Sequence, residues 1–325
     1  MRVILRRWRA DVVRLVYKML KVYEVGPRDG LQNEATLLSV AQKQRLIAGL
    51  VDAGLRHIEA TSFVHPKAVP QLADADEVMA DVTARYQEDG IEFVGLVFNE
   101  RGYERALAGG CRSMAFGAAV SETFSLRNTH NTPRQALDTA RYLIDRARSD
   151  GVATRVYVMT AWVCPFEGLI SPRKTMAVVE EIAGWGVDEI AIADTIGHAD
   201  PLAVGRLIDM IARRVAMERL AVHLHDTQAL GLANATTALQ AGIRTFDSSV
   251  GGLGGCPFAP GAAGNLATED LVFLAFKVGL GTGVDFARLW EVVYDLERMI
   301  GRPIGGRIRQ WWESSQDHEP RVDFN

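Results

Sequence analysis

The sequence predicts an α/β protein, built as a closed parallel (β/α)8 barrel (TIM barrel) with a C-terminal helical extension. Eight short runs of β-branched or apolar residues recur along the chain, and segments of helical period separate them. Their mean spacing of roughly 30 residues accommodates a strand, a crossover helix and two loops, as a barrel of about 250 residues requires. A doubly wound open sheet is the rival fold, but no Gly-x-Gly-x-x-Gly turn follows the first run.

The predicted elements alternate in a regular order. The predicted strands are residues 21–25, 55–60, 91–98, 113–120, 154–160, 189–193, 221–225 and 244–249. The segments between them are long enough for crossover helices, which parallel neighbouring strands require. The predicted helices include residues 38–53, 133–149, 172–184, 201–217 and 229–241.

Two terminal segments lie outside the predicted barrel of residues 21–270. Residues 1–20 form a basic amphipathic N-terminal extension, with a single acidic residue, Asp11. It is compatible with a dispensable extension or with an arm that binds a membrane or a partner, and it lacks the serine richness of a transit peptide. Residues 271–325 carry apolar residues at helical spacing. We expect them to form a helical cap over one barrel mouth or to contact a second subunit.

The composition excludes several classes of protein. With 48% hydrophobic and 23% charged residues and a mean hydropathy of +0.02, the 325-residue chain is typical of a globular protein. A net charge of −4 argues against nucleic acid as a partner. Three cysteines are too few and odd in number for a disulfide framework, which favours a reducing, cytoplasmic location. The sequence contains no run of eighteen apolar residues that could span a bilayer, so we expect no stable membrane insertion.

Polar side chains gather at the carboxyl ends of the predicted strands, where barrel enzymes carry their chemistry. Arg28 and Asp29 follow the first strand, and Glu59 lies near the end of the second. Burying the charge of Glu59 is costly unless it is paired, and Arg28 is the candidate partner. This pair has two interpretations, one structural and one catalytic. The residues expected to bind the substrate are Arg28, Ser121, Tyr157 and Thr195.

His223 and His225 stand two residues apart on the seventh predicted strand, so both imidazoles point to the same face. Together with the carboxylate of Asp29 and the amide oxygen of Asn265, they offer a mixed nitrogen and oxygen set that suits a divalent metal. The alternative interpretation is a pair of satisfied core histidines.

A glycine-rich loop, residues 251–255, leads to Cys256 and Pro257. A loop of this composition can close over a ligand, and a thiol with an ordinary pKa of about 8.5 is a suitable proton donor. The alternative is a tight turn with Cys256 as a small buried hydrophobe. Cys164 is the competing thiol, in a segment with fewer glycines.

Five segments, in the same order, resemble the 3-hydroxy-3-methylglutaryl-CoA (HMG-CoA) lyase family. They are residues 25–34 (VGPRDGLQNE), 59–64 (EATSFV), 223–227 (HLHDT), 248–259 (SSVGGLGGCPFA) and 264–270 (GNLATED). The resemblance extends from about residue 20 to about residue 310. It implies a metal-dependent barrel lyase that uses Mg2+ or Mn2+, with the positions matching Asp29, His223, His225 and Asn265 as the ligands.

The resemblance also implies a set of catalytic residues: Arg28, Glu59, His223 and Cys256. Cleavage of a 3-hydroxyacyl thioester between its second and third carbons removes the hydroxyl proton and leaves a thioester enolate. A divalent metal would acidify that hydroxyl group. Arg28 would stabilise the enolate oxygen with its planar fork, and Cys256 would return a proton to carbon.

The chain departs from the family pattern at several positions. The fifth strand ends in Met159-Thr-Ala-Trp162, where small residues are more usual, and we expect this bulk to shrink or reshape the acyl pocket. Gly231 stands two places later after the histidines than in the family, and His198 and Asp200 replace small neutral residues. Ala35 stands at a position where many members of the family have a lysine. No metal ligand is lost.

Three functional hypotheses follow. The first is HMG-CoA lyase activity, giving acetyl-CoA and acetoacetate in leucine breakdown. The second is the same chemistry on another 3-hydroxy-3-alkylacyl-CoA. The third is a Claisen-condensing acyltransferase of the isopropylmalate or homocitrate synthase type, disfavoured by the Gly-Gly-Cys-Pro loop and by the absence of a long regulatory extension. A non-catalytic metal-binding scaffold is the remaining possibility. The expected partners are an acyl-CoA substrate and a second subunit in a homodimer.

Overall fold

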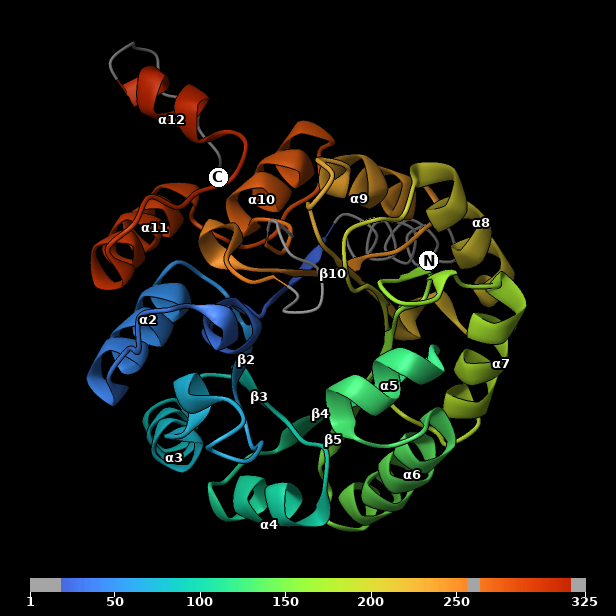
Figure 1. Cartoon of the computed structure of the whole chain (residues 1–325). Coiled ribbons are helices and arrows are strands. Elements are labelled where there is room, and N and C mark those ends of the chain that lie inside the picture. Colours follow the sequence, from blue (N-terminus) through green and yellow to red (C-terminus); the bar gives the residue numbers. More distant parts are fainter. Residues whose placement is uncertain (1–18, 256–263, 317–325) are drawn as a thin grey trace, which may run out of the picture.

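The computed structural model describes residues 19–255 and 264–316. Within these ranges eight parallel strands close into a barrel in the order β1-β10-β9-β8-β5-β4-β3-β2 (Figure 1). The strands are β1 (Lys21–Glu24), β2 (His57–Ser62), β3 (Glu92–Leu96), β4 (Ser113–Ala119), β5 (Ala153–Met159), β8 (Glu189–Asp194), β9 (Leu220–Leu224) and β10 (Thr245–Ser248). The predicted fold and all eight predicted strands are confirmed, and their ends differ by no more than two residues.

Helices surround the strands as an outer ring (Figure 1). They are α2 (Val40–Asp52), α3 (Ala75–Arg85), α4 (Glu100–Ala108), α5 (Glu122–Thr129), α6 (Pro133–Ser149), α7 (Pro172–Ala183), α8 (Pro201–Ala212), α9 (Gly231–Gln240), α10 (Thr268–Lys277), α11 (Phe286–Ile300) and α12 (Arg309–Gln316). The five predicted crossover helices are present.

The local sequence explains where several helices begin. A capping box of Ser39 with Gln42 starts α2, and a second one, of Thr132 with Gln135, starts α6. Proline occupies the first position of α6, α7 and α8, where a missing N–H removes no hydrogen bond. Asn99 caps α4 by accepting a hydrogen bond from the backbone N–H of Gly102.

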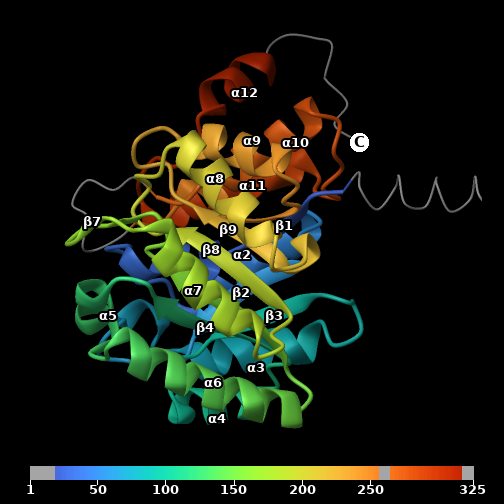
Figure 2. The ribbon, with the colours of Figure 1, turned by 90° about the vertical axis from the view of Figure 1, so that its right-hand side faces the viewer.

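Helices α3, α4 and α5 were not among the predicted elements, and neither was the short hairpin of β6 (Val163–Cys164) and β7 (Gly168–Leu169). α4 has 9 residues and α5 has 8, so each offers too few turns for a clear helical period. β6 and β7 have two residues each and pair only with each other. The hairpin projects from the rim, where β7 marks the edge of the molecule in Figure 2.

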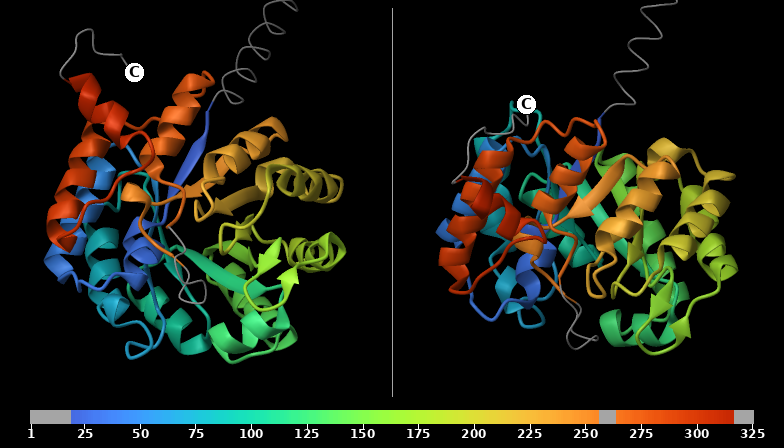
Figure 3. Two further views of the ribbon diagram at one scale, coloured as in Figure 1. Left: turned by 45° about the horizontal axis from the view of Figure 1, so that its top comes forward. Right: turned by 90° about the horizontal axis from the view of Figure 1, so that it is seen from above.

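The C-terminal helices lie beside the barrel wall. α10 follows β10 as the eighth barrel helix and begins at Thr268, so it crosses the predicted boundary at residues 270/271. α11 packs against α2 and α10 on the outside of the ring, and Figure 3 shows α11 and α12 gathered on one side in both views. Trp290 of α11 stacks on Trp312 of α12 with ring centroids 5.8 Å apart, which ties the two helices together.

The lumen of the barrel has a polar and an apolar side. Tyr157 of β5 lies in register with Gly117 of β4 and with Ala191 of β8. Because side chains alternate along a strand, β4 and β8 send only small residues inward at this level. The strands β9, β10 and β2 send the side chains of His223, Asp247 and Glu59 into the same space, whereas β1 sends Tyr23 inward and Glu24 outward toward Thr268 of α10. At the level of Tyr157 the polar side chains are therefore concentrated on one half of the barrel, whereas the charged Arg155 of β5 and Glu189 of β8 lie nearer the amino ends of their strands.

Candidate active site

Asp29, His223 and His225 converge at the carboxyl end of the barrel. One potential ligand atom from each lies within 4.8 Å of the others, and all three side chains are buried. Ligands bound at 2.0–2.6 Å to one divalent ion are separated by up to about 4–5 Å, so this spacing fits a single ion. The structure therefore contains a possible metal site formed by three of the four predicted ligands.

The two imidazoles meet through their Nε2 atoms, 3.0 Å apart. Two ring nitrogens at this distance share a proton or a cation, because their lone pairs alone would repel each other. Burial, together with the charge of His223, lowers the pKa of His225 to about 3. His225 is therefore neutral at physiological pH, as a metal ligand must be.

Asn265 joins this group from the segment after β10. Its Nδ2 donates to Oδ2 of Asp29 at 2.7 Å and to the carbonyl of Leu253 at 3.0 Å. Its Oδ1 is buried and has no hydrogen-bond partner. An unpaired buried amide oxygen beside a carboxylate and two imidazoles is an available oxygen donor for a cation. The residues present thus fit a divalent metal.

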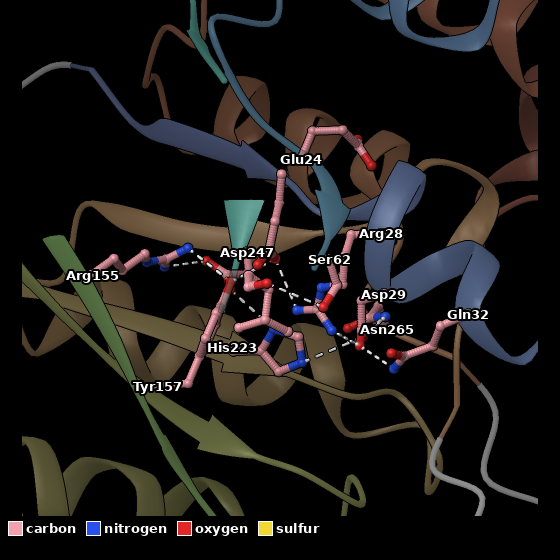
Figure 4. Close-up of polar contacts among 12 residues, drawn as sticks. Glu24, Arg28, Asp29, Gln32, Ser62, Arg155, Tyr157, His223, Asp247 and Asn265 are labelled. Carbon is pink, nitrogen blue, oxygen red and sulfur yellow. Dashed lines mark hydrogen bonds and ion pairs between the residues drawn. The ribbon is translucent and has the colours of Figure 1, made fainter. Parts of the chain in front are cut away.

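A carboxylate that the sequence reasoning missed orients the first histidine. Asp247 of β10 accepts the Nδ1–H of His223 at 3.0 Å, which leaves only Nε2 of this ring free (Figure 4). Arg155 of β5 binds the other oxygen of Asp247 at 2.5 Å. Burial raises the pKa of Asp247, but Arg155 and His223 outweigh this effect and lower it. The signal available in the sequence was a charged residue inside each of two apolar strands.

Arg28, Glu59 and Tyr157 form a second connected group. Arg28 binds Oε2 of Glu59 at 2.8 Å and Oδ1 of Asp29 at 2.5 Å. Tyr157 donates to the same oxygen of Glu59 at 3.0 Å. Burial lowers the pKa of Arg28, but the two carboxylates outweigh it and hold the pKa above the usual range. The predicted pairing of Arg28 with Glu59 is present, and it places a fixed cation next to the candidate metal ligands.

The turn after β1 presents both Arg28 and Asp29. Residues Gly26–Gly30 form a single helical turn in which the carbonyl of Val25 accepts from the backbone N–H of Asp29 at 2.7 Å. The turn packs closely on the segment after β10, since a Cβ atom on Gly30 would lie 2.7 Å from Oγ of Ser249. Glu24 holds the two segments together by accepting from the N–H groups of Gly26 and Val250.

A cavity of about 470 Å³ opens onto these groups at the carboxyl ends of the strands. Its volume is in the usual range for a ligand pocket. The cavity lining includes Arg28, Asp29, Tyr157, Thr195, His223 and His225 of the predicted site. Gln32 and Ser62 also line it and were not predicted. Gln32 donates to Oδ1 of Asp29 at 2.7 Å, which links the rim of the cavity to the ligand group.

Ser121 is not part of the cavity lining. It is fully buried, and its Oγ caps α5 by accepting from the N–H of Phe124 at 3.1 Å. The same hydroxyl contacts Glu167 at 2.7 Å and Sγ of Cys164 at 2.9 Å. The expectation that Ser121 binds the substrate does not agree with this position, because the hydroxyl is already engaged in helix capping.

The two candidate thiols differ in what the structure describes. Cys164 is 1% exposed, packs in an apolar cluster with Phe124 and Ile170, and does not line the cavity. Cys256 lies outside the described residues. Gly255, the residue before it, does line the cavity, and its carbonyl accepts from Nδ2 of Asn33 at 2.6 Å.

Of the two bulky residues at the end of β5, only one faces the cavity. Met159 lines it. Trp162 turns outward, where it is 5% exposed and donates from Nε1 to the carbonyl of Ala203 on α8 at 3.2 Å. The expected effect on the pocket can therefore come from Met159, and the part of the expectation that concerned Trp162 is wrong. Asp200, another departure from the family, caps α8.

A C-terminal strap (residues 302–307) joins three of the loops that carry the site. Arg302 pairs with Glu34 after β1, and the N–H of Gly305 donates to the carbonyl of Gly251 at 3.1 Å. Arg307 binds Asp226, the residue after His225, at 2.6 Å. The strap follows α11 directly, so the predicted cap reaches the barrel mouth through a short segment.

Comparison with known proteins places the chain in a family. The model of the HMGL-like family matches residues 19–295. The chain belongs to the HMGL-like family. Hydroxymethylglutaryl-CoA lyase of Pseudomonas mevalonii is 42% identical over 282 residues, which are 87% of this chain and 93% of that protein. The mitochondrial hydroxymethylglutaryl-CoA lyase of Bos taurus is 41% identical over 90% of this chain and 89% of its own length.

Solved structures of the HMGL-like family agree with this assignment. A hydroxymethylglutaryl-CoA lyase from Pseudomonas aeruginosa superimposes with a TM-score of 0.87 at 40% identity and covers 92% of this chain and 98% of its own. An HMG-CoA lyase in complex with coenzyme A and 3-methylmalate superimposes with a TM-score of 0.88 at 36% identity, covering 94% of this chain and 99% of its own. The predicted family and enzyme class, a carbon–carbon lyase, are confirmed.

More distant structures share the barrel alone. The carboxyl transferase domain of Rhizobium etli pyruvate carboxylase superimposes with a TM-score of 0.67 at 16% identity, over 87% of this chain and 47% of its own. At this identity the likeness shows the fold and no more. Within the part of the chain that the structure describes, no helix is both long and apolar enough to cross a membrane.

Proposed function

We propose that this chain is a divalent-metal-dependent lyase that cleaves HMG-CoA to acetyl-CoA and acetoacetate. The proposal rests on one observation: a possible metal site and a buried arginine–glutamate pair lie side by side in one cavity. The cluster of Asp29, His223 and His225 contacts the Arg28–Glu59 pair through the 2.5 Å link between Arg28 and Asp29. A cation site beside a fixed guanidinium suits a reaction in which two neighbouring oxygens of one substrate carry negative charge.

The proposed ligands are Asp29, His223, His225 and Asn265. A bound Mg2+ or Mn2+ would polarise the hydroxyl and carboxylate oxygens of the substrate. The sequence implied a catalytic role for His223 in addition to ligation. Its Nδ1–H is held by Asp247, so Nε2 is its one free nitrogen, and we assign that nitrogen to metal binding.

Arg28 is proposed to stabilise the thioester enolate. Cleavage moves the electron pair of the C2–C3 bond onto the thioester group, while the third carbon becomes the ketone of acetoacetate and its hydroxyl proton passes to water. The guanidinium is 6% exposed and lines the cavity, so it can donate to the enolate oxygen with little competition from water. Glu59 and Tyr157 hold the guanidinium in place through their shared contact at Oε2 of Glu59.

Cys256 is proposed to deliver the proton that converts the enolate to acetyl-CoA. The proposal rests on the family resemblance of residues 248–259 and on the position of Gly255 in the cavity lining. Cys164 is a poor alternative, because its thiol is buried against Ser121 outside the cavity. Thr195 and Tyr157 line the cavity and remain the proposed substrate contacts.

The test is a panel of acyl-CoA substrates on the purified protein with Mg2+ or Mn2+, followed by mass spectrometry of the products. Formation of acetyl-CoA and acetoacetate from HMG-CoA, abolished by a chelator and restored by metal, is the expected result. Release of free thiol that requires acetyl-CoA and an added 2-keto acid would identify a condensing acyltransferase instead. If no product forms under either condition, a non-catalytic metal-binding scaffold is the remaining hypothesis.

Two further assignments belong to the same proposal. The chain is proposed to act as a homodimer, which sedimentation velocity of the purified protein will test. A cytoplasmic location and a role in leucine breakdown follow from the cysteine usage and from the proposed substrate, and both are testable by fractionation of cells and by growth on leucine after gene deletion.

A further inference from the structure

One wall of the cavity is apolar and lies across the barrel from the polar half that holds the ligand group. It is formed by the inward side chains at the ends of β3, β4, β5 and β8. We call it the apolar wall, and its residues are Leu96, Phe98, Gly117, Met159 and Ala193. None of these side chains carries a hydrogen-bonding group, so the wall can contact only an apolar part of a ligand.

Met159 and Phe98 close over the one glycine of this wall. A Cβ atom on Gly117 would lie 2.9 Å from Cε1 of Phe98 and 3.2 Å from Cε of Met159. Met159 is two residues after Tyr157 on β5, so both point into the lumen and Met159 lies nearer the mouth. The methionine side chain therefore limits the space above Tyr157, on the side of the cavity that faces the metal ligands.

The residue after Met159 holds it in place at a cost in backbone strain. Thr160 has a φ of 54°, a left-handed conformation that β-branched residues rarely adopt. Its N–H donates to Oγ1 of Thr195 at 2.7 Å, and its own Oγ1 accepts from the N–H of Ser121 at 3.2 Å. The carbonyl of Met159 accepts from the N–H of Val120 at 3.0 Å. Both neighbouring strand ends thus fix the end of β5.

The chemistry of the substrate determines which part of it meets this wall. The third carbon of a 3-hydroxy-3-alkylglutaryl thioester carries a hydroxyl, a carboxymethyl arm, the thioester arm and one alkyl group. The oxygens of the first three require the polar half of the barrel. The alkyl group is the only substituent without a polar atom, and the apolar wall is the surface that accepts it without leaving a buried polar group unpaired.

We propose that Met159 is a specificity-determining residue that restricts the alkyl group on the third carbon to methyl. This inference rests on the proposed function, since it assigns one substituent of the proposed substrate to one wall of the site. A longer chain would enter the space that Met159 and Phe98 occupy above Gly117. Thr160, held by its hydrogen bonds to Thr195 and Ser121, prevents the end of β5 from moving aside.

The test compares two non-cleavable analogues that lack the 3-hydroxyl group, 3-methylglutaryl-CoA and 3-butylglutaryl-CoA. Binding of each is measured by isothermal titration calorimetry, and cleavage of the two corresponding 3-hydroxy thioesters is measured in parallel. The variants are Met159→Ala and the milder Met159→Val. Met176→Ala is the matched control, because Met176 is a partly buried methionine on α7 outside the cavity.

The wild-type protein is expected to favour the methyl analogue by about 10-fold or more, as steric exclusion from an apolar pocket typically gives. Met159→Ala should reduce this preference by about 10-fold, Met159→Val by less, and Met176→Ala by no more than about two-fold. An unchanged preference in folded Met159→Ala and Met159→Val, checked by circular dichroism, overturns the inference.

The outcomes separate this inference from the proposed function. A Met159-dependent preference in analogue binding, without cleavage of any hydroxy thioester, refutes the lyase proposal and leaves the role of Met159 standing. Cleavage of HMG-CoA with no Met159-dependent preference refutes the role of Met159 alone. Absence of binding of both analogues, together with absence of cleavage of both hydroxy thioesters, refutes both.

Discussion

Replacing Asp247 by asparagine tests whether this buried carboxylate controls the proposed metal site through its contact with His223. Asp247 has two strong contacts, with Nδ1 of His223 at 3.0 Å and with Arg155 at 2.5 Å. An asparagine keeps the shape but offers one oxygen in place of two. It can satisfy either the histidine or the arginine, while its NH2 group faces the other as an unsuitable donor.

The size of the effect follows from these contacts. If the NH2 group faces His223, Nδ1 must become the acceptor and the ring proton moves to Nε2, where it blocks ligation. Loss of a carboxylate behind a metal-binding histidine typically costs about 10–100-fold in metal affinity, which is about 1.4–2.7 kcal/mol. The free energy of unfolding should fall by about 2–3 kcal/mol, less than for an orphaned buried charge, since Arg155 keeps its 2.9 Å contact with Glu189.

The assay is a titration with Mn2+ followed by electron paramagnetic resonance of the free ion, with urea unfolding of the same preparations. Asp188→Asn is the control, because Asp188 accepts hydrogen bonds from Thr154 at the opposite end of the barrel. It should lose some stability and leave the Mn2+ dissociation constant unchanged. A folded Asp247→Asn variant that binds Mn2+ within about two-fold of the wild type would refute the reasoning.

Three further changes probe other parts of the molecule. Arg28→Lys keeps the charge but loses the planar fork, so kcat should fall about 100-fold with little change in Mn2+ affinity; a near wild-type kcat would leave Arg28 a structural ion-pair partner. Cys256→Ser should abolish turnover without lowering the melting temperature, and a variant that keeps most of its kcat would exclude this thiol as the proton donor. Burial raises the pKa of Glu24 from 4.5 to about 7, so the ionised form opposes folding and wild-type stability falls as pH rises through that window. Glu24→Gln should remove this loss of about 3 kcal/mol between pH 4.5 and 7, and urea unfolding at pH 5 and pH 8 would contradict the argument if both proteins kept the same pH dependence.

Several properties of this protein were determined by the sequence alone because they depend on local periodicity. Alternation of eight apolar runs with helical segments predicts the closed barrel, and parity along a strand places His223 and His225 on one face. The cost of burying a lone charge predicts the pairing of Arg28 with Glu59. These inferences need only periodicity along the chain, the cost of burying a charge and the rule that barrel chemistry lies at the carboxyl ends of strands.

Other properties were decided by tertiary structure, because they depend on which distant segments barrel closure brings together. The contact of Asp247 with His223 follows from the pairing of β10 with β9; a charged residue in an apolar strand marks Asp247 in the sequence, but it does not identify the partner. Ser121 ends a strand like its neighbours, yet it caps the next helix instead of lining the cavity. Met159 faces the cavity and Trp162 leaves it, since the left-handed turn at Thr160 redirects the chain between them. A strand end can be read from periodicity, but the direction in which its last side chains point is set by hydrogen bonds from strands and helices packed against it.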